Sequence, residues 1–345
     1  MGTTKRKEMN TMANIAKKYI NNEISYLRQF NNSAGDVSKF GRNLNLCALE
    51  GTIAPVFNRE NEVRAIQKIM MRRTKPNVLL TGPAGCGKTA IAEALAHHLA
   101  YQKAEYMAKK AKIERDYEKA LAEWEENADE VDPITGELLN RPEMPTIAEP
   151  PLLHAIVYEL SMNSMVSGSK YRGDFEEKME SIIKVCKRNP EIILFIDEIH
   201  QMGAIGQAEG TSNMAQILKP ALARADIRVI GATTTEESSI LKKDKALARR
   251  FCDIEVCPLV GETAIATAES ILRDYQKFHK LSITKELNGK VILEMVNYHI
   301  GGVFPNNFID VIDETMSGAK FDGLTSIGLP EIKATLSRIS GNVIL

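Results

Sequence analysis

The sequence lacks the signatures of several protein classes. Its five cysteines form no Cys-x-x-Cys pair, which argues against a zinc site and a disulfide framework. Its six histidines form neither His-x-x-x-His nor His-x-x-Glu-His, the spacings typical of metal hydrolases. It has no run of about 18 apolar residues and no apolar signal core at the N-terminus. We therefore expect a cytoplasmic protein, in a reducing compartment, without a membrane partner.

A strong charge of either sign is also missing. The chain has 44 Lys and Arg residues against 45 Asp and Glu residues, a net charge of −1. Proteins that bind DNA or RNA usually carry an excess of basic residues, so nucleic acid is an unlikely partner. The 345 residues, 44% hydrophobic and 26% charged, are typical of a soluble protein with two domains, or with one domain and a satellite.

The stretch from Val78 to Ala90 carries the most specific motif. Apolar residues lead into a glycine-rich turn, which is followed by a helical pattern. The turn fills the pattern Gly-x-x-x-x-Gly-Lys-Ser/Thr of a phosphate-binding loop, in which Lys88 reaches the β- and γ-phosphates of a nucleoside triphosphate and Thr89 ligates Mg²⁺. Glycines let the backbone wrap a phosphate, and the helix N-terminus adds about half a positive charge. The nucleotide-binding residues expected here are Gly82, Pro83, Ala84, Gly85, Cys86, Gly87, Lys88, Thr89 and Ala90.

Short apolar runs alternate with helical patterns around this loop. We expect strands at residues 154–160, 192–196, 227–231 and 254–256, besides the strand that enters the loop, and helices at 59–73, 90–100 and 175–187. This alternation predicts an α/β fold, with a parallel sheet covered by helices on both faces. From about residue 263 to 314 the pattern is helical throughout, which predicts a small helical lid.

Acidic and hydroxyl residues close two of the expected strands. Ligands bind at the carboxyl ends of parallel strands, so Asp197, Glu198 and Thr234 are expected beside the phosphate loop. We interpret Asp197 as a Mg²⁺ ligand and Glu198 as the group that polarises the attacking water. Thr234 would bond that water or the γ-phosphate. The alternative is a strand-end acidic pair that caps the next helix.

Two basic segments have more than one interpretation. Arg249 and Arg250 precede Phe251 and form either a surface pair or, if presented to a neighbouring subunit, an arginine finger. A second loop precedes the helix at 175–187, and its aromatic ring between cations suits either stacking on bases or gripping a peptide. Its residues are Lys170, Tyr171, Arg172 and Gly173.

Two further segments stand apart in composition. Residues 1–36 form a polar N-terminal extension with a weak helical stripe, expected to pack on the main body or to serve as a partner-docking arm. Residues 101–126 are rich in Lys, Glu and Ala, and prolines follow from 133 to 151. We expect a protruding helix that returns through an extended loop. This 101–150 insertion is either a solvated arm or a docking site for a neighbouring subunit or adaptor.

Taken together, these motifs resemble the first nucleotide-binding domain of the Clp-type AAA+ ATPases, such as ClpB, ClpA and ClpC. The resemblance covers residues 37 to 322 apart from the insertion, and the runs Lys-Tyr-Arg-Gly and Leu-Lys-Pro-Ala-Leu-Ala-Arg are specific to this subfamily. The matching runs are 40–42, 55–56, 59–60, 72–75, 82–90, 170–177, 194–200, 208–210, 218–224, 231–234, 243–244, 249–251, 271–273, 283–284 and 309–314.

This resemblance implies an ATPase that forms a homo-hexameric ring with nucleotide at the subunit interfaces. Tyr171 takes the position of the pore-loop tyrosine that contacts translocating polypeptide. Arg250, with Arg249 beside it, takes the position of the finger that acts on the neighbouring subunit, and Thr234 takes the sensor position. Val56 and Phe57 would lie near the adenine.

The resemblance also implies how the chain is divided into domains and which of the possible functions is favoured. We expect an N-terminal helical extension (1–36), an AAA+ α/β subdomain (37–260), a helical small subdomain (261–322) and a linker-like tail (323–345), without the family's N-terminal, middle or second ATPase domains. The leading hypothesis is a single-ring, ATP-driven remodeller that pulls polypeptide through a pore. The alternatives are a nucleic-acid-associated AAA+ ATPase, such as a helicase or clamp loader, and an ATP-gated assembly factor that acts through the insertion.

Overall fold

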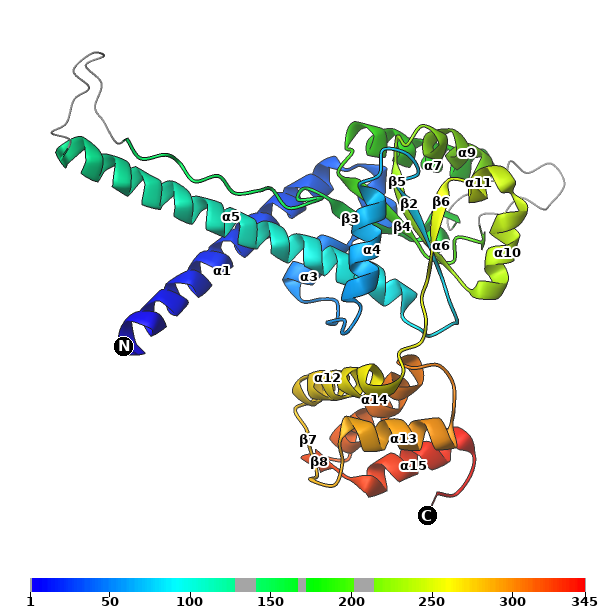
Figure 1. Ribbon diagram of the computed structural model, residues 1–345. Helices are drawn as coiled ribbons and strands as arrows, with labels where there is room; N and C mark the ends of the chain where they lie inside the picture. The colour runs from blue at the N-terminus through cyan, green and yellow to red at the C-terminus, as the bar shows by residue number, and fades with distance from the viewer. Residues whose placement is uncertain (1, 128–140, 167–171, 202–213, 345) are drawn as a thin grey trace, which may run out of the picture.

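The computed structural model describes residues 2–127, 141–166, 172–201 and 214–344. Figure 1 shows two packed bodies in this part of the chain. The larger, which we call the α/β body, runs from α1 to β6 and contains the main sheet. The smaller, which we call the helical lid, runs from α12 to α15 and lies beyond one end of that sheet.

Within the described residues, the main sheet has six strands in the order β1-β3-β4-β5-β2-β6. All neighbours pair in parallel except β1, which pairs antiparallel with β3 at the edge. The predicted parallel sheet is confirmed, whereas the three-residue edge strand β1 was too short to be predicted. The strands are β1 (Gly41–Asn43), β2 (Asn77–Thr81), β3 (Ile156–Leu160), β4 (Ile192–Ile196), β5 (Arg228–Thr233) and β6 (Phe251–Glu255).

Helices cover both faces of the sheet. Alternate residues of β2 point to opposite faces, so Leu79 joins one hydrophobic cluster while Val78 and Leu80 join the other. The first cluster is covered by α1 (Gly2–Ser33), α2 (Asp36–Phe40), α7 (Arg172–Arg188), α9 (Met214–Ala223), α10 (Thr235–Lys243) and α11 (Lys245–Ala248), and the second by α3 (Leu44–Glu50), α4 (Glu60–Met70) and α5 (Lys88–Asn127). Because both faces are buried, β2 and β4 are apolar along almost their whole length.

Two long helices project from the α/β body (Figure 1). Helix α5 has 40 residues, which corresponds to about 60 Å. The expected helices at 90–100 and 101–126 are therefore one element, because neither glycine nor proline interrupts residues 88–127. Helix α1 packs on α5, and an ion pair between Lys103 and Glu23 joins the two helices at 2.7 Å. Each of these two side chains is 11% exposed. The N-terminal extension thus packs on the main body.

The helical lid has its own apolar core. It contains α12 (Gly261–His279), α13 (Gly289–His299), α14 (Asn306–Phe321) and α15 (Leu329–Ser340), with the short parallel pair β7 (Ser282–Ile283) and β8 (Ser326–Ile327). The segment expected as a linker-like tail from residue 323 instead belongs to this core: Ile327, Ile332 and Leu336 are fully buried in it. These apolar side chains pack against buried residues of α12, α13 and α14. For this reason β8 and α15 are part of the lid.

The remaining short helix, α6 (Met162–Val166), follows β3 directly. Among the described residues, no helix combines the length and the apolar character that crossing a membrane requires.

Candidate functional site

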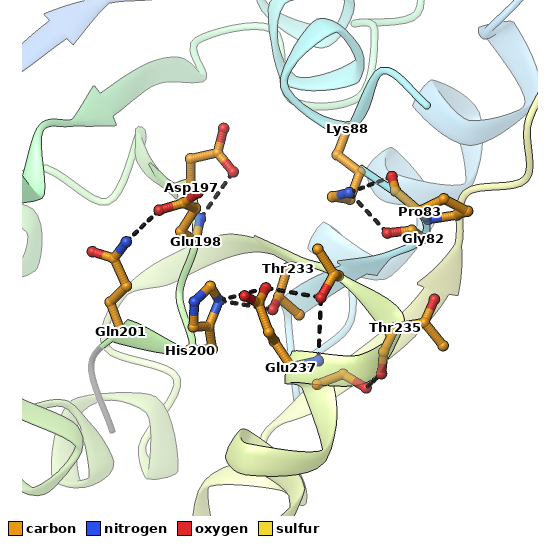
Figure 2. Close-up of polar contacts among 12 residues, drawn as sticks. Gly82, Pro83, Lys88, Asp197, Glu198, His200, Gln201, Thr233, Thr235 and Glu237 are labelled. Carbon is orange, nitrogen blue, oxygen red and sulfur yellow. Dashed lines mark hydrogen bonds and ion pairs between the residues drawn. The ribbon is translucent and has the colours of Figure 1, made fainter. Parts of the chain in front are cut away.

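The phosphate loop connects β2 to the first turn of α5, as predicted. Gly87 has φ +93°, a left-handed conformation that side chains rarely adopt. Gly82 is close to the backbone, since a Cβ there would lie 2.3 Å from the Val256 carbonyl oxygen. The Lys88 Nζ donates to the carbonyl oxygens of Gly82 (2.9 Å) and Pro83 (2.8 Å), as Figure 2 shows. The Lys88 ammonium is thus bound by the carbonyl oxygens of its own loop.

The predicted acidic pair lies directly after β4. The Thr89 hydroxyl donates to Asp197 Oδ2 at 2.5 Å, which brings the two expected Mg²⁺ ligands together. The other oxygen, Asp197 Oδ1, accepts from the Glu198 backbone N–H at 2.8 Å. Glu198 is exposed, and its carboxylate accepts a hydrogen bond from the Gln201 side chain (Figure 2).

Glu198 has an uncommon backbone conformation. Its φ of +49° lies in the left-handed region, which costs a residue other than glycine about 1–3 kcal/mol. Such conformations persist where the surrounding structure enforces them, and they cluster at functional sites. Here the fully buried strand β4 and the bond from Glu198 N–H to Asp197 hold the turn in place. The carboxylates of Asp197 and Glu198 therefore both lie at the carboxyl end of β4.

A second polar group closes β5 beside the first. Thr234 follows the strand and begins α10: its hydroxyl accepts from the Glu237 backbone N–H and donates to the Glu237 carboxylate at 2.8 Å. This hydrogen bond lowers the pKa of Glu237. His200 Nδ1 lies 3.0 Å from the Thr233 hydroxyl and 3.2 Å from Glu237.

Sequence reasoning missed His200 and Glu237. The signal for Glu237 was present, because Thr234-x-x-Glu237 has the spacing of a capping box at a helix start. No comparable signal existed for His200, whose role depends on two elements meeting in space. Figure 2 shows the His200 ring beside Thr233 and the Glu237 carboxylate.

Most of these groups, His200 excepted, line one cavity of about 910 Å³, which is large enough for a small-molecule ligand. The sheet, the phosphate loop and the lid all contribute to its walls. The predicted residues along it are Ala84, Gly85, Gly87, Lys88, Thr89, Ala90, Asp197, Glu198 and Thr234, and the lid adds Pro305, Asn306 and Ile309. Six of the nine predicted loop residues, the acidic pair and Thr234 thus line one cavity, whereas Gly82, Pro83 and the buried Cys86 do not.

An ionic cluster not singled out from the sequence borders the same cavity. Arg42 on β1 donates to Glu159 on β3 at 2.9 Å and to Glu93 on α5 at 3.2 Å. Burial raises the pKa of Glu93, and Glu159 raises it further, while Arg42 lowers it. Glu93 is one helical turn beyond Thr89, so the cluster anchors the first turns of α5 to the sheet edge.

Several predicted residues lie elsewhere. Val56 lines a separate cavity of about 460 Å³ between α4 and α5, and Phe57 packs against the core of the lid. Arg249 and Arg250 lie between α11 and β6 and do not line the main cavity. Within a single chain, none of these four side chains meets the phosphate loop residues there.

Part of the candidate pore loop lies outside the residues that the structure describes. Lys170 and Tyr171 are outside the described residues, and Arg172 and Gly173 begin α7. The structure therefore places the end of this loop at the start of α7, on the side of the sheet covered by the first cluster.

The site also has the chemistry of a Mg²⁺ site. Among the described residues no group of three or more His, Cys, Asp or Glu side chains could hold a metal ion alone. The convergent pair of one hydroxyl (Thr89) and one carboxylate (Asp197) is an oxygen-only set. Mg²⁺ is typically held by one or two carboxylates together with waters and substrate phosphates. The residues present thus fit Mg²⁺ bound with a nucleotide.

Comparisons with known proteins agree with this geometry. Residues 56–288 match a family described as an ATPase domain predominantly from Archaea. The chain is 34% identical over 295 residues to the chaperone protein ClpB of Aquifex aeolicus, covering 85% of this chain and 25% of that one. It is 33% identical to the chloroplastic chaperone protein ClpC2 of Arabidopsis thaliana, covering 87% of this chain and 27% of that one.

Solved structures show the same likeness. The Saccharomyces cerevisiae Hsp104–ADP complex superposes with a TM-score of 0.64 at 29% identity, and the Hsp104–casein complex with 0.64 at 27%. Each comparison covers 89% of this chain and 46% of the Hsp104 chain. The chain spans about a quarter to a third of the length of the curated relatives it matches and under half of the Hsp104 chains. The chain therefore belongs to this ATPase family, and over most of its length it is similar to the Clp-type AAA+ chaperones.

Proposed function

We propose that this cavity binds ATP with Mg²⁺ and hydrolyses it to ADP and phosphate. Lys88 leaves the carbonyl oxygens of Gly82 and Pro83 and binds the β- and γ-phosphates instead. Thr89 and Asp197 hold the Mg²⁺, which would neutralise phosphate charge when bound. Glu198 polarises the attacking water, and the Thr234 hydroxyl turns from Glu237 to the γ-phosphate. The convergence of Thr89, Asp197 and Glu198 beside Lys88 is the observation that carries this proposal.

The arginine pair supports hydrolysis between subunits. Arg249 is exposed and Arg250 half-buried, and neither borders the cavity of its own chain. If this pair supplies an arginine finger, it therefore acts on the cavity of a second copy, an effect worth about 10³–10⁵ in rate where such a finger acts. We assign Arg250 to this role with Arg249 beside it, in a homo-hexameric ring. Val56 and Phe57 would lie near the adenine, where the α/β body meets the lid.

The ring would use this energy to remodel proteins. Lys170 and Tyr171 directly precede α7, which begins with Arg172 and Gly173, and the tyrosine would grip a polypeptide drawn through the ring's pore. The curated relatives are named as chaperones, and one Hsp104 complex contains casein. Together these support ATP-driven threading of polypeptide, with unfolded protein as substrate.

One measurement tests this function. We expect unfolded casein to stimulate the ATPase rate and single-stranded DNA to leave it unchanged. Tyr171→Ala should abolish both the stimulation and the unfolding of a tagged substrate, while basal hydrolysis persists. The matched control is Tyr298→Ala on the lid, where the ring is 85% exposed, and it should behave as wild type. Full unfolding activity in the Tyr171→Ala variant would contradict threading.

A further inference from the structure

Arg59 is a buried charge that contacts the phosphate loop without lining the main cavity. It immediately precedes α4, and only 5% of the residue is exposed. Its Nη2 donates to the Cys86 carbonyl oxygen at 2.7 Å. Its Nη1 donates to the Cys257 carbonyl oxygen at 3.1 Å and pairs with the Glu62 carboxylate at 2.7 Å. Burying a charge costs free energy unless such partners replace water, so the contacts of this guanidinium are the condition for its burial.

The contact with Cys86 fixes one peptide bond of the phosphate loop. Cys86 is fully buried, whereas the next residue, Gly87, lines the main cavity. The peptide bond between them is trans, so its C=O and N–H groups point in opposite directions. Since the carbonyl oxygen faces Arg59, the Gly87 N–H is turned away from Arg59. Backbone N–H groups of this kind hold the phosphates in phosphate-binding loops.

The contact with Cys257 reaches the connection between the α/β body and the lid. This connection, residues 256–260, leaves β6 and enters α12 (Figure 1). The two residues before Arg59 reach the lid itself. Phe57 packs against the lid core, and Asn58 Nδ2 donates to the Thr267 hydroxyl on α12 at 2.7 Å. Residues 57–59 therefore contact the lid, its connection and the phosphate loop from three consecutive positions.

We propose that Arg59 is a positioning residue for ATP hydrolysis: it holds the Gly87 N–H toward the phosphates and links that peptide bond to the connection of the lid. The inference rests on the ATP site proposed above and adds a residue that does not line it. A phosphate bound to the Gly87 N–H also fixes the Cys86 carbonyl oxygen and, through Arg59, the Cys257 carbonyl oxygen. Nucleotide binding should therefore slow hydrogen exchange in residues 256–260.

Arg59→Lys tests the contact with the phosphate loop. Lysine keeps the charge, but its ammonium lacks the planar, two-sided geometry with which the guanidinium binds separate partners. We expect the KM for ATP to rise about ten-fold and kcat to stay within about two-fold, because the Gly87 N–H binds phosphate in the ground state and the transition state alike. Titration with ADP should show the same loss of affinity. Arg64→Lys, at an exposed arginine of the same helix, is the matched control and should keep the wild-type KM.

A merely structural role would give a different result. It would lower the fraction of folded protein, so that kcat falls while the KM stays unchanged, and this outcome would overturn the proposal. If Arg59→Lys fails to fold, Glu62→Ala replaces it, since that variant removes only the carboxylate partner of Nη1. Its KM should rise about three-fold, as the loss of one partly exposed ion pair predicts, and an unchanged KM would likewise contradict the role of Arg59.

Hydrogen exchange with and without ADP measures the link to the lid. ADP should slow exchange of residues 256–260 in wild type and in Arg64→Lys, and should slow it much less in Arg59→Lys at saturating ADP. Equal slowing in all three proteins would disprove this link. A wild type that neither binds ADP nor hydrolyses ATP contradicts the proposed function itself, whereas unchanged binding in the Arg59 and Glu62 variants contradicts the positioning role alone.

Discussion

At the scale of single residues, the cavity shows how few side chains are needed for the proposed chemistry. Thr89 and Asp197 meet at 2.5 Å, Lys88 is held by its own loop, and Glu198 stands exposed on a strained turn. Every one of these is a charged or polar group placed at a strand end or helix start. Their positions follow from the sheet, so the chemistry depends on the backbone as much as on the residue types.

Glu198→Gln should bind ATP normally and hydrolyse it about 10²–10⁴ times more slowly. The amide keeps the size and the contact with Gln201 but cannot polarise water as a carboxylate does. Steady-state ATPase assays together with nucleotide titration separate the two effects. Glu236→Gln, an exposed acid on α10, is the matched control and should retain wild-type turnover. Near wild-type turnover of Glu198→Gln would exclude the role given to this carboxylate.

The sequence predicted this site unevenly, for physical reasons. The phosphate loop and Asp197–Glu198 lie in local patterns of a few residues, so their proximity followed from one rule about parallel strands. Arg42 pairs with Glu159 across 117 positions, and no short spacing indicates such a contact. His200 depends likewise on where β5 and α10 lie. Contacts between distant segments are set by packing, which a single sequence does not display.

At the scale of elements, two segments acquire their role through packing. Helix α15 was expected in a linker, yet it completes the core of the lid. Helix α1 showed only a weak stripe, yet its residues Leu27 and Phe30 are buried in the core of the α/β body. In both cases a modest apolar periodicity suffices because a neighbouring surface is available to cover it.

Leu336→Ala should destabilise the lid by about 2–5 kcal/mol. The side chain is fully buried, so its removal leaves a cavity among α13, α14 and α15. Chemical denaturation followed by circular dichroism measures the loss. Ile339→Ala on the same helix is the control: its side chain is 37% exposed, and we expect a smaller loss than for Leu336→Ala. If Leu336→Ala leaves the free energy of unfolding unchanged, α15 does not contribute to the core of the lid and is a tail, as the sequence predicted.

The ion pair that joins α1 and α5 should likewise matter. Lys103→Ala leaves Glu23 nearly buried without its partner, whereas Arg28→Ala breaks a pair with Glu50 in which the arginine is 66% exposed. Breaking a buried pair typically costs about 3–5 kcal/mol, and breaking an exposed one at most about 1 kcal/mol. We therefore expect hydrogen exchange of α1 to accelerate strongly in the first variant and little in the second. Equal exchange in both would show that apolar packing alone anchors α1.

At the scale of the whole molecule, the nucleotide cavity lies where three parts meet. The phosphate loop, the ends of β4 and β5, and Pro305, Asn306 and Ile309 of the lid all border it. A nucleotide bound there would touch both the α/β body and the lid, so its loss or hydrolysis can change how the two are held. The arginine pair, helix α1 and the outer part of α5 do not line this cavity, so further copies of the chain can reach them.

Mixing two inactive variants tests whether the site is completed by a neighbour. Arg250→Ala should bind nucleotide with wild-type affinity but lose most of its hydrolysis, because the transition-state charge goes unpaired. Lys88→Ala should lose nucleotide binding, yet it still carries an intact Arg250. In a mixed ring, a Lys88→Ala subunit can present its arginine to the intact cavity of an Arg250→Ala subunit. We therefore expect activity to appear on mixing, highest near equal amounts, as measured by phosphate release. If no ratio of the two restores hydrolysis, Arg250 acts within its own chain or not at all, since only a contact between copies can make two defective chains complement each other.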